Sequence, residues 1–387
     1  MHVITPRHIV YVAPFGLRHK STVWARTLPL ARRLVAGGHK ATILIPPWDS
    51  PQDAGTVEER DGVQLEHLPL RGGIPGTVLR LVRRIDELAP DLIHIVKPRA
   101  HAGLVQRLLA ARKTRPPLLL DLDDWEQAWN PINRYPWLVA RFLAWQEEWG
   151  IRHADGITAA SSWLMQAAYD RAPTTPRLYL PNGVDPTPKV ASRPQHPNAP
   201  PRILYFSRLV ETTPAWLAAC WQALLDHQPD ARLFIAGEPV QPHLAPPFHA
   251  VLDRLPGVTW LGYVPAPQLP TLYADVNCAI FPADPTPLQA AKCSVRLATT
   301  LLHGVPVVAS AVGEQAAYGA DGVATLVPPT ASPAEFAQAI LRTLAQPPTS
   351  PDRIRAVLLS RYAWQDLAKR LEHFYADIAT PRNSGAA

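Results

Sequence analysis

The chain has 387 residues, of which 47% are hydrophobic and 18% charged, and its formal net charge is +6 with a pI near 9.3. This length exceeds the size at which one hydrophobic core usually stops growing, so we expect two domains, and the composition excludes a disordered chain. The positive charge fits an anionic substrate or an anionic membrane surface, whereas the lack of dense Lys and Arg clusters argues against nucleic acid.

The cysteines and the apolar segments indicate the compartment. Cys220, Cys278 and Cys293 are widely spaced and form no C-x-x-C pair, which predicts neither a disulfide framework nor a zinc site. No segment approaches the roughly 20 apolar residues of a spanning helix, and the N-terminal apolar run lacks a cleavage site. We therefore expect a cytoplasmic protein that is soluble or attached peripherally to the inner membrane face.

The first half of the chain alternates apolar runs with helical patterns. The expected strands are "HIVYVAPF", "HKATILIPP", "PDLIHIV", "PPLLLDLDDWE" and "ADGITAAS", and a helix is expected at "STVWARTLPLARRLVAGG". Alternation of this kind predicts a parallel sheet with helices on both faces, and continuous apolar runs are typical of such buried strands. We assign residues 1–185 to this N-terminal domain.

A Pro-rich segment, "PNGVDPTPKVASRPQHPNAPP", follows and can form neither a helix nor a central strand. We place a linker at residues 186–201. Beyond it the alternation restarts with "RILYFSRL", "ARLFIAGEP", "VTWLGYV", "NCAIFP", "VPVVAS" and "ATLVPP". This predicts a second α/β domain at residues 202–360, followed by a C-terminal helix at 361–380.

Several motifs, in this order, resemble those of the GT-B fold and of glycosyltransferase family 4, which are retaining enzymes that use a nucleotide sugar. The motifs are "ARRLVAGGHKATIL", "PNGVD", "FSRLVE", "LFIAGE", "LLHGVPVVAS" and "GVATLVPP", and the resemblance covers nearly the whole chain. It implies two Rossmann-like parallel-sheet domains, an α/β architecture, facing a cleft. It also implies that the closing helix "RYAWQDLAKRLEHFYADI" crosses back to the N-terminal domain.

The resemblance implies that Arg208 in "FSRLVE" holds the donor diphosphate and serves catalysis, and a planar guanidinium suits two phosphate oxygens. A surface arginine at a strand end is the alternative. The family's lysine five residues later is Thr213 here, so one cationic contact is missing. Lys292 and Arg296 are candidates for replacement charge, although solvated residues at a helix end would look the same.

A helix that begins near Ser294 is the second part of the expected donor site. Ser294 is a good N-cap and Gly304 a good terminator, which predicts a helix of about nine residues. The free amides that follow Ser294, including that of Val295, predict an anion site. The family's two glutamates correspond here to Thr299 and Ala291, and without a charged acceptor for the ribose we expect donor affinity to fall by about 1–2 kcal/mol.

The remaining donor-binding candidates are two loop residues, Gly16 in "APFGLRHKST" and Val264 in "LGYVP". Gly16 permits close backbone approach, and Ser21 or Thr22 is expected to cap the helix that follows. An ordinary strand-to-helix turn is the alternative for this loop. No G-x-G-x-x-G motif occurs, so a dinucleotide fingerprint is excluded.

Four acids follow one another closely at the end of the strand in "LLLDLDDWE", namely Asp121, Asp123, Asp124 and Glu126. In an α/β sheet this end faces the ligand crevice, so we predict catalytic roles for Asp123 and Asp124, with helix-capping acids as the alternative. Family members often carry a histidine near the position of Asp123, so its replacement by an acid predicts a polar or amino-bearing sugar or a changed role. Unrelated GT-A enzymes bind a metal with a D-x-D pattern, but the second alternating domain argues against that fold. We predict no metal and no cofactor beyond the nucleotide-diphosphate sugar co-substrate.

The expected acceptor-binding residues are Trp125, Glu126 and His101, with Trp129 as a further ring beside the acids, although a lone histidine is more often structural. Three other tryptophans, Trp137, Trp145 and Trp149, fit helical spacing and are predicted to lie in the core.

The arginines of "TVLRLVRRIDELA", namely Arg80, Arg83 and Arg84, would suit anionic lipid, and a solvated helix face is the alternative.

These features together predict a glycosyltransferase that moves a sugar from a nucleotide-diphosphate sugar to a glycan or lipid-linked acceptor of the cell envelope, with retention. The expected partners are the nucleotide-sugar donor, that acceptor and the membrane surface. Another GT-B activity, such as an epimerase or a phosphorylase, is the rival among enzymes. The missing lysine and glutamates favour a third hypothesis, in which a degenerate GT-B protein binds glycan or nucleotide, or scaffolds a glycosylation complex.

Overall fold

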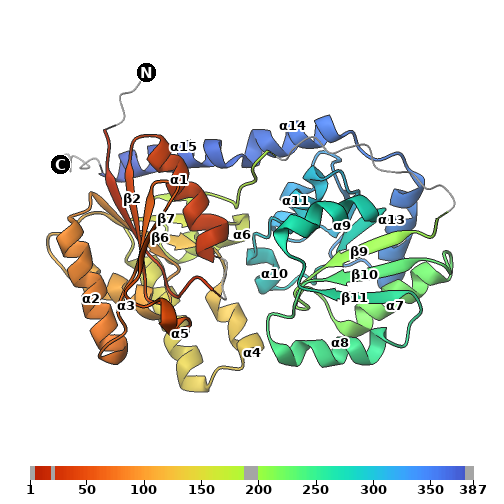
Figure 1. Ribbon diagram of the computed structural model, residues 1–387, viewed down its shortest axis with the longest axis horizontal. Coiled ribbons are helices and arrows are strands. Elements are labelled where there is room, and N and C mark those ends of the chain that lie inside the picture. The colour runs from red at the N-terminus through yellow and green to blue at the C-terminus, as the bar shows by residue number, and fades with distance from the viewer. Residues whose placement is uncertain (1–4, 19–21, 187–198, 380–387) are drawn as a thin grey trace. The chain divides into compact units, whose positions relative to one another are not determined.

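The computed structural model describes residues 5–18, 22–186 and 199–379. Two compact units make up the chain (Figure 1). The first unit comprises Met1–Gly183, Ala291–Cys293 and Trp364–Ala387, and the second comprises Val184–Ala290 and Ser294–Ala363. Most of the expected linker, residues 187–198, lies outside the described residues.

The sheet of the first unit has the strand order β3-β4-β2-β1-β5-β6-β7-β8 across the described residues. The strands are β1 (His8–Val12), β2 (Lys40–Ile45), β3 (Val57–Arg60), β4 (Val63–His67), β5 (Leu92–Val96), β6 (Leu118–Leu122), β7 (Gly156–Ala159) and β8 (Arg177–Tyr179). Neighbouring strands are parallel except for β3 and β4, which pair antiparallel at the edge. Every residue of β5, β6 and β7 is buried, as expected for a parallel sheet covered on both faces.

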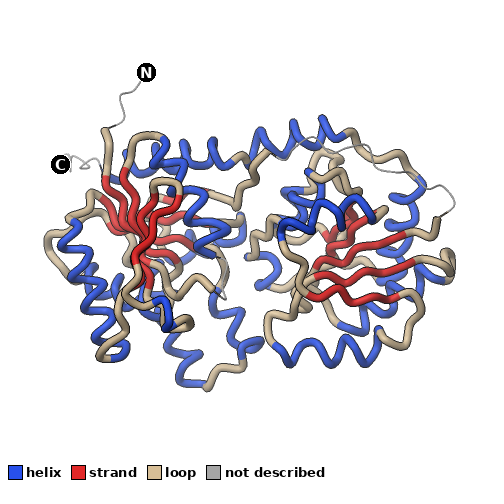
Figure 2. The backbone as a smooth tube through the Cα atoms, in the orientation of Figure 1, coloured by secondary structure: helices blue, strands red, loops and turns tan. Residues whose placement is uncertain are grey.

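The helices of the first unit surround this sheet, as Figure 2 shows. They are α1 (Leu28–Ala36), α2 (Gly73–Leu88), α3 (Ala100–Ala110), α4 (Asn130–Asn133), α5 (Trp137–Arg152), α6 (Ser162–Arg171) and α15 (Trp364–Ala379). A π-helical turn, Val23–Thr27, leads into α1. Thr22 stands at its start without a side-chain cap hydrogen bond, so the expected cap by Thr22 is wrong, and Ser21 lies outside the described residues.

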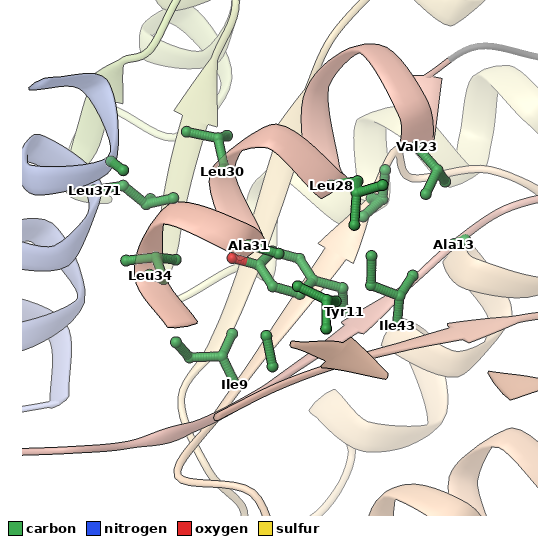
Figure 3. Close-up of a cluster of buried hydrophobic side chains, with 14 of the residues drawn as sticks. Ile9, Tyr11, Ala13, Val23, Leu28, Leu30, Ala31, Leu34, Ile43 and Leu371 are labelled. Carbon is green, nitrogen blue, oxygen red and sulfur yellow. The ribbon is translucent and has the colours of Figure 1, made fainter. Parts of the chain in front are cut away.

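The core of the first unit joins the two ends of the chain. Ile9 and Tyr11 of β1 pack with Leu34 of α1 and with Leu371 of α15 (Figure 3). The hydroxyl of Tyr375 on α15 lies 3.0 Å from that of Tyr11 and 2.7 Å from His94 Nδ1. The last helix therefore completes the core that the first strand begins.

The second unit is built on a wholly parallel sheet with the order β11-β10-β9-β12-β13-β14 within the described residues. Its strands are β9 (Arg202–Phe206), β10 (Arg232–Ala236), β11 (Val258–Gly262), β12 (Cys278–Phe281), β13 (Val307–Ser310) and β14 (Thr325–Val327). Its helices are α7 (Pro214–Leu225), α8 (Ala245–Leu252), α9 (Leu269–Asp275), α10 (Pro287–Ala291), α11 (Arg296–Leu302), α12 (Glu314–Tyr318), α13 (Pro333–Ala345) and α14 (Pro351–Tyr362).

The predicted α/β class is confirmed, because each unit has a parallel-dominated sheet with helices around it. The antiparallel hairpin of β3 and β4 was not expected from the sequence. Across the described part of the chain, no helix combines the length and the apolar character needed to cross a bilayer.

Candidate functional site

A buried ion pair between Arg26 and Asp121 lies near the carboxyl end of β6. Arg26, in the π-helical turn, donates from Nε and Nη2 to the two carboxylate oxygens of Asp121, both at 2.7 Å. Its Nη1 donates to Leu180 O and Asn182 Oδ1, and Thr158 Oγ1 also donates to Asp121. Burial alone would raise the pKa of Asp121, but Arg26 outweighs it and holds that pKa below its usual value. Asp121 therefore connects β6 to β7 and to the π-helical turn.

The acids that follow Asp121 surround one lysine. Lys97, which follows β5, lies with Nζ 2.7 Å from Asp124 Oδ2, 3.0 Å from Glu126 Oε1 and 3.5 Å from Asp123 Oδ2. Arg99 donates to the second oxygen of Glu126 and to the Tyr135 hydroxyl. We call Lys97, Arg99, Asp123, Asp124 and Glu126 the acidic cluster. Its two cations and three carboxylates leave one uncompensated negative charge.

The carboxyls of the acidic cluster differ in their proton affinity. Burial raises the pKa of Asp124, Lys97 lowers it, and the charges of Asp123 and Glu126 raise it again, to a net value of about 6. For Glu126 the effect of burial is outweighed by Lys97 and Arg99, which lower its pKa to about 2. The Asp124 side chain is 21% exposed and that of Glu126 only 4%. Asp124 is therefore the most exposed carboxyl of the cluster, and its pKa lies nearer neutrality than that of Glu126.

The loop that carries Lys97 is strained. Lys97 and Ala100 adopt φ values of 65° and 49°, a left-handed conformation that costs about 1 kcal/mol or more for a residue with a side chain. The side chain of Gln146 holds the loop by accepting from Ala100 N and donating to Ala100 O. Strain of this kind gathers at functional sites, where the surrounding structure fixes it.

A further carboxyl, Glu147 of α5, supports the acidic cluster from below. It is fully buried and accepts hydrogen bonds from the backbone N–H groups of Glu126 at 2.7 Å and Gln127 at 3.1 Å. Burial, followed by the charge of Glu126, raises the pKa of Glu147 to about 8. Glu147 therefore fixes the backbone of the cluster, and its raised pKa favours the protonated form at neutral pH.

The expected acceptor residues lie in different surroundings. Trp125 is buried edge-on to Trp163, with the guanidinium of Arg171 over its ring at 4.5 Å, so its packing gives no support for stacking on a sugar. His101 is also buried, and its Nδ1 has no hydrogen-bond partner among the described residues. Trp129 is half-buried, with Lys292 Nζ 5.8 Å from its ring centre.

Gly16 lies in the loop after β1, and its backbone approaches the Asp49–Ser50 loop. Its N–H donates to Asp49 Oδ1 at 2.6 Å, and an added Cβ would overlap the Ser50 hydroxyl. The close backbone approach expected for Gly16 is thus made to another loop of the same unit.

In the second unit, the loop that follows the first strand runs from β9 to α7. The carboxylate of Glu211 accepts from Ser207 Oγ at 2.6 Å, from the backbone N–H groups of Arg208 and Val210, and from Arg296 Nη2 at 2.7 Å. Leu209 adopts a positive φ of 58°. We call residues 207–213 the arginine loop, and Glu211 holds its shape.

Arg208 projects from the arginine loop and is exposed. Its guanidinium makes no hydrogen bond or ion pair with any residue that the structure describes, in contrast to Arg296. Loss of surrounding water, then repulsion by Arg296, lowers the pKa of Arg208 below its usual value. Thr213, in place of the family's lysine, caps α7 by accepting from Trp216 N.

The helix expected at Ser294 is shorter than predicted. α11 begins at Arg296 after an N-cap at Val295 without a side-chain cap, so the assignment of Ser294 as the cap is wrong. The Ser294 hydroxyl instead accepts from Arg296 Nε, and Arg296 also donates to Phe206 O. Gly304 has a φ of 73° after the last turn, as expected for a terminator.

The other donor candidates lie on different elements. Thr299 is half-buried on α11, and Val264 is half-buried in the loop after β11. Lys292 belongs to the short segment Ala291–Cys293 that groups with the first unit.

Gly237 follows β10 with a φ of 110°, and its Cα lies against Ser207 O, so that an added Cβ would overlap this oxygen.

Sequence reasoning missed Glu211 and Arg26. Glu211 stands in the quoted "FSRLVE" motif, but its role depends on Arg296, which is 85 residues distant. Arg26 pairs with Asp121 across 95 residues. The charge of Arg26 within an apolar helix was the signal that could have drawn attention to it.

The structure brings together no group of three or more His, Cys, Asp or Glu side chains arranged to hold a metal ion in residues 5–18, 22–186 and 199–379. The absence of a metal from the reaction stays a prediction.

Comparison with solved structures defines the fold. The chain is similar to sucrose-phosphate synthase from Thermosynechococcus elongatus, with 16% identity, a TM-score of 0.70, and coverage of 96% of this chain and 99% of that one. It is also similar to HepE of Anabaena in complex with UDP-glucose, with 16% identity, a TM-score of 0.67, and coverage of 96% and 100%. A glycosyltransferase from Rickettsia africae matches with 15% identity, a TM-score of 0.67, and coverage of 97% and 100%. These likenesses place the chain in the GT-B fold class.

The family follows from the sequence of each unit. Residues 21–183 match the family described as "Glycosyl transferase 4-like domain", and residues 200–346 match the one described as "Glycosyl transferases group 1". The chain belongs to the group 1 glycosyltransferases of the GT-B fold. A search of curated proteins found no match.

Proposed function

We propose that this glycosyltransferase moves a sugar from a nucleotide-diphosphate sugar, bound by the second unit, to a glycan or lipid-linked acceptor of the cell envelope, bound by the first unit. Transfer proceeds with retention of configuration in the cytoplasm, at the inner membrane face. The observation that carries the proposal is Arg208, an exposed guanidinium without an ion-pair partner among the described residues, at the carboxyl end of β9. An arginine in this state is available to a diphosphate, whose negative charge grows as the sugar leaves.

The arginine loop supports this assignment. Glu211 fixes the backbone on both sides of Arg208, so the guanidinium stands on a preorganised support. Arg296 lies beside it but is bound to Glu211 at 2.7 Å, so much of its charge is compensated. Arg208 then supplies the principal positive charge to the diphosphate, and Arg296 positions the loop.

The acidic cluster supports a role on the acceptor side. Asp124, partly exposed and with a pKa raised to about 6, can accept a hydrogen bond from a sugar hydroxyl and exchange a proton near neutral pH. The negative cluster favours an acceptor or donor sugar that carries hydroxyl or amino groups. A metal is not required by this scheme.

The proposal is tested by titrating the purified full chain with UDP-, GDP-, ADP- and TDP-sugars, using calorimetry and thermal shift. We expect one donor to bind and the Arg208→Ala variant to lose at least tenfold in affinity, because a charge-assisted pair contributes about 1.5–3 kcal/mol. Arg342→Ala removes an exposed arginine on α13 and should bind as the wild type does. Donor binding that is equal in both variants would remove Arg208 from the site.

A second candidate is a degenerate GT-B protein that binds glycan or nucleotide without transfer, or scaffolds a glycosylation complex. Three observations favour it, namely Thr299 and Ala291 at the family's glutamate positions and Glu211 compensating Arg296. If no donor binds at millimolar concentration, this candidate takes precedence. Donor binding without product formation in the presence of cell-envelope lipid extracts would also support it.

A further inference from the structure

Helix α5 exposes an apolar face that the core prediction did not anticipate. Five of its large apolar residues are exposed, namely Trp137 at 71%, Leu138 at 70%, Trp145 at 44%, Val139 at 41% and Phe142 at 40%. Helical spacing predicts that Trp137 and Trp145 lie in the core, and the structure shows that this prediction is wrong. Helical spacing shows that side chains share a face, but it does not show whether that face points inward.

The exposed side chains form a continuous surface. Leu138, Phe142 and Trp145 are spaced by four and three residues, so they lie along one side of the helix. The rings of Phe142 and Trp145 stack with centroids 5.8 Å apart. These three side chains line a shallow hollow together with Arg141, Ala144 and Glu148. A contiguous exposed apolar surface of this kind is typical of sites that bind proteins or membranes.

The opposite side of α5 is fixed within the first unit. Leu143, Gln146 and Glu147 are buried there, and Gln146 is hydrogen-bonded to Ala100. The exposed face is therefore carried by a helix that is anchored on its other side, and its exposure does not result from a loosely attached element.

The segment that carries most of this face is positively charged. Residues 127–146 contain Arg134 and Arg141 and no Asp or Glu, and both arginines are exposed. The guanidinium of Arg141 lies 5.9 Å from the ring centre of Trp137. Of the acids that follow, Glu147 is buried and Glu148 is bound by Arg152 and Arg171. A ligand for this face should combine apolar groups with negative charge.

We propose that α5 docks the protein on the surface of a membrane that contains anionic lipids. Tryptophan, phenylalanine and arginine on one helix face suit the boundary between headgroups and acyl chains, where a ring is buried and a guanidinium meets phosphate. The inference deepens the proposed function, on which it rests, because a lipid-linked acceptor lies in that surface. A second copy of the chain fits less well, because symmetric pairing would bring four arginines together without acids to offset them.

The helix suggested by the sequence for this role, α2, is less suited to it. Its Arg84 is bound to Glu66 and Glu87, and its Arg80 donates to the carbonyl oxygens of Pro69 and Arg71. These two arginines are committed to the protein itself. α2 does expose Ile74 at 56% and Leu79 at 62%, which makes it a matched control.

The test is co-sedimentation of the full chain with vesicles of phosphatidylcholine alone and of phosphatidylcholine and phosphatidylglycerol in about equal parts. We expect the wild type to bind the anionic vesicles. The triple variant Trp137→Gln, Leu138→Gln, Phe142→Gln should bind them with at least tenfold lower affinity. The variant Ile74→Gln, Leu79→Gln should bind as the wild type does. The variant Arg134→Gln, Arg141→Gln should lose the preference for anionic vesicles.

Thermal unfolding of each variant checks that the fold is intact. We expect it to be intact because the substituted side chains are exposed. Equal vesicle binding by the α5 variant and the wild type would overturn the proposal, as would absence of binding by the wild type. A dimer that the α5 variant dissociates would assign the face to a second copy. Because vesicle binding is measured without donor, and donor titration without vesicles, failure of one proposal is distinguishable from failure of the other.

Discussion

At the scale of single residues, the first unit depends on charges that are removed from water. Arg26 and Asp121 have side chains that are 1% and 6% exposed and are joined by two hydrogen bonds. Loss of one partner of such a pair leaves an uncompensated buried charge, which costs more than the pair itself contributes. The packing of the π-helical turn against β6 and Asn182 therefore depends on both side chains of the pair.

We predict that Asp121→Asn lowers the free energy of unfolding by about 3–5 kcal/mol. The amide cannot balance the guanidinium of Arg26, and its own N–H groups would face those of Arg26. Urea denaturation of the full chain measures this loss. The matched control is Asp86→Asn, because Asp86 also makes two hydrogen bonds to an arginine, Arg112, but on the surface, and it should cost less than about 1 kcal/mol. Equal losses in both variants would contradict the prediction.

Glu147 gives stability a dependence on pH. Its pKa rises from an ordinary 4.5 to about 8 in the folded chain, first through burial and then through the charge of Glu126. The folded chain thus keeps a proton that the unfolded chain releases above pH 4.5. The contribution of Glu147 to stability is complete below that pH and is lost as the pH rises through about 8.

We predict that wild-type stability falls between pH 5.5 and 8 by about 3 kcal/mol more than that of Glu147→Gln. The glutamine has no proton to release, so the variant is the less stable protein at pH 5.5, where it lacks the second oxygen acceptor, and the difference narrows as the pH rises. Denaturation midpoints at several pH values provide the measurement. Parallel pH profiles in the two proteins would show that Glu147 is ionised at neutral pH.

The sequence predicted the carboxylates of the acidic cluster better than the cations that bind them. Asp123, Asp124 and Glu126 closely follow an apolar strand, and their place beyond its carboxyl end is a local property of the chain. That Lys97 meets all three depends on the pairing of β5 with β6 and on the positive φ of Lys97, which no local pattern specifies for a lysine. Arg208 was found by its motif, but the support from Glu211 and Arg296 depends on a contact distant in sequence.

At the scale of elements, continuous apolar runs identified most of the parallel strands, including β5, β6 and β7, which are buried along their whole length. The hairpin of β3 and β4 was missed, since Glu58, Glu59 and Arg60 on β3 are an exposed edge with no apolar alternation. The start of α11 was also missed. Ser294 has the right chemistry for a cap, but its hydroxyl accepts from Arg296 Nε.

We predict that Gly237→Ala disturbs the arginine loop and lowers donor affinity at least tenfold. The backbone of Gly237 lies against Ser207, the first residue of the arginine loop, and the added methyl group can fit only if Ser207 moves. Gly38→Ala is the control, because its φ of 97° is comparable to the 110° of Gly237 and nothing lies within 4 Å of the added Cβ. Both variants carry the backbone strain of about 1–3 kcal/mol, which thermal unfolding should report, whereas only Gly237→Ala should lose donor binding. Unchanged donor affinity in Gly237→Ala would show that the contact of Gly237 with Ser207 does not affect donor binding.

At the scale of the whole molecule, the chain begins and ends in the same core. α15 carries Trp364, Leu367, Leu371 and Tyr375 into the cluster built on β1, although more than 300 residues separate the two elements along the chain. The second unit has a separate core formed by β9, β10, β12 and the helices α7 and α13. Stability of the first unit therefore requires the last helix, while the core of the second unit does not contain it.

We predict that Leu367→Asp destabilises the first unit selectively, because Leu367 is fully buried and an unpaired carboxylate there costs several kcal/mol. Hydrogen exchange resolved by segment measures this, since amide protection reports local opening. Amides of β1 and β5 should exchange faster, and those of β9 and β10 should keep their wild-type rates. Lys369→Asp places the same side chain on the exposed side of α15 and should leave both sets unchanged. Faster exchange in β9 and β10 in the Leu367→Asp variant would mean that the two units unfold together, and that the last helix stabilises the molecule as a whole.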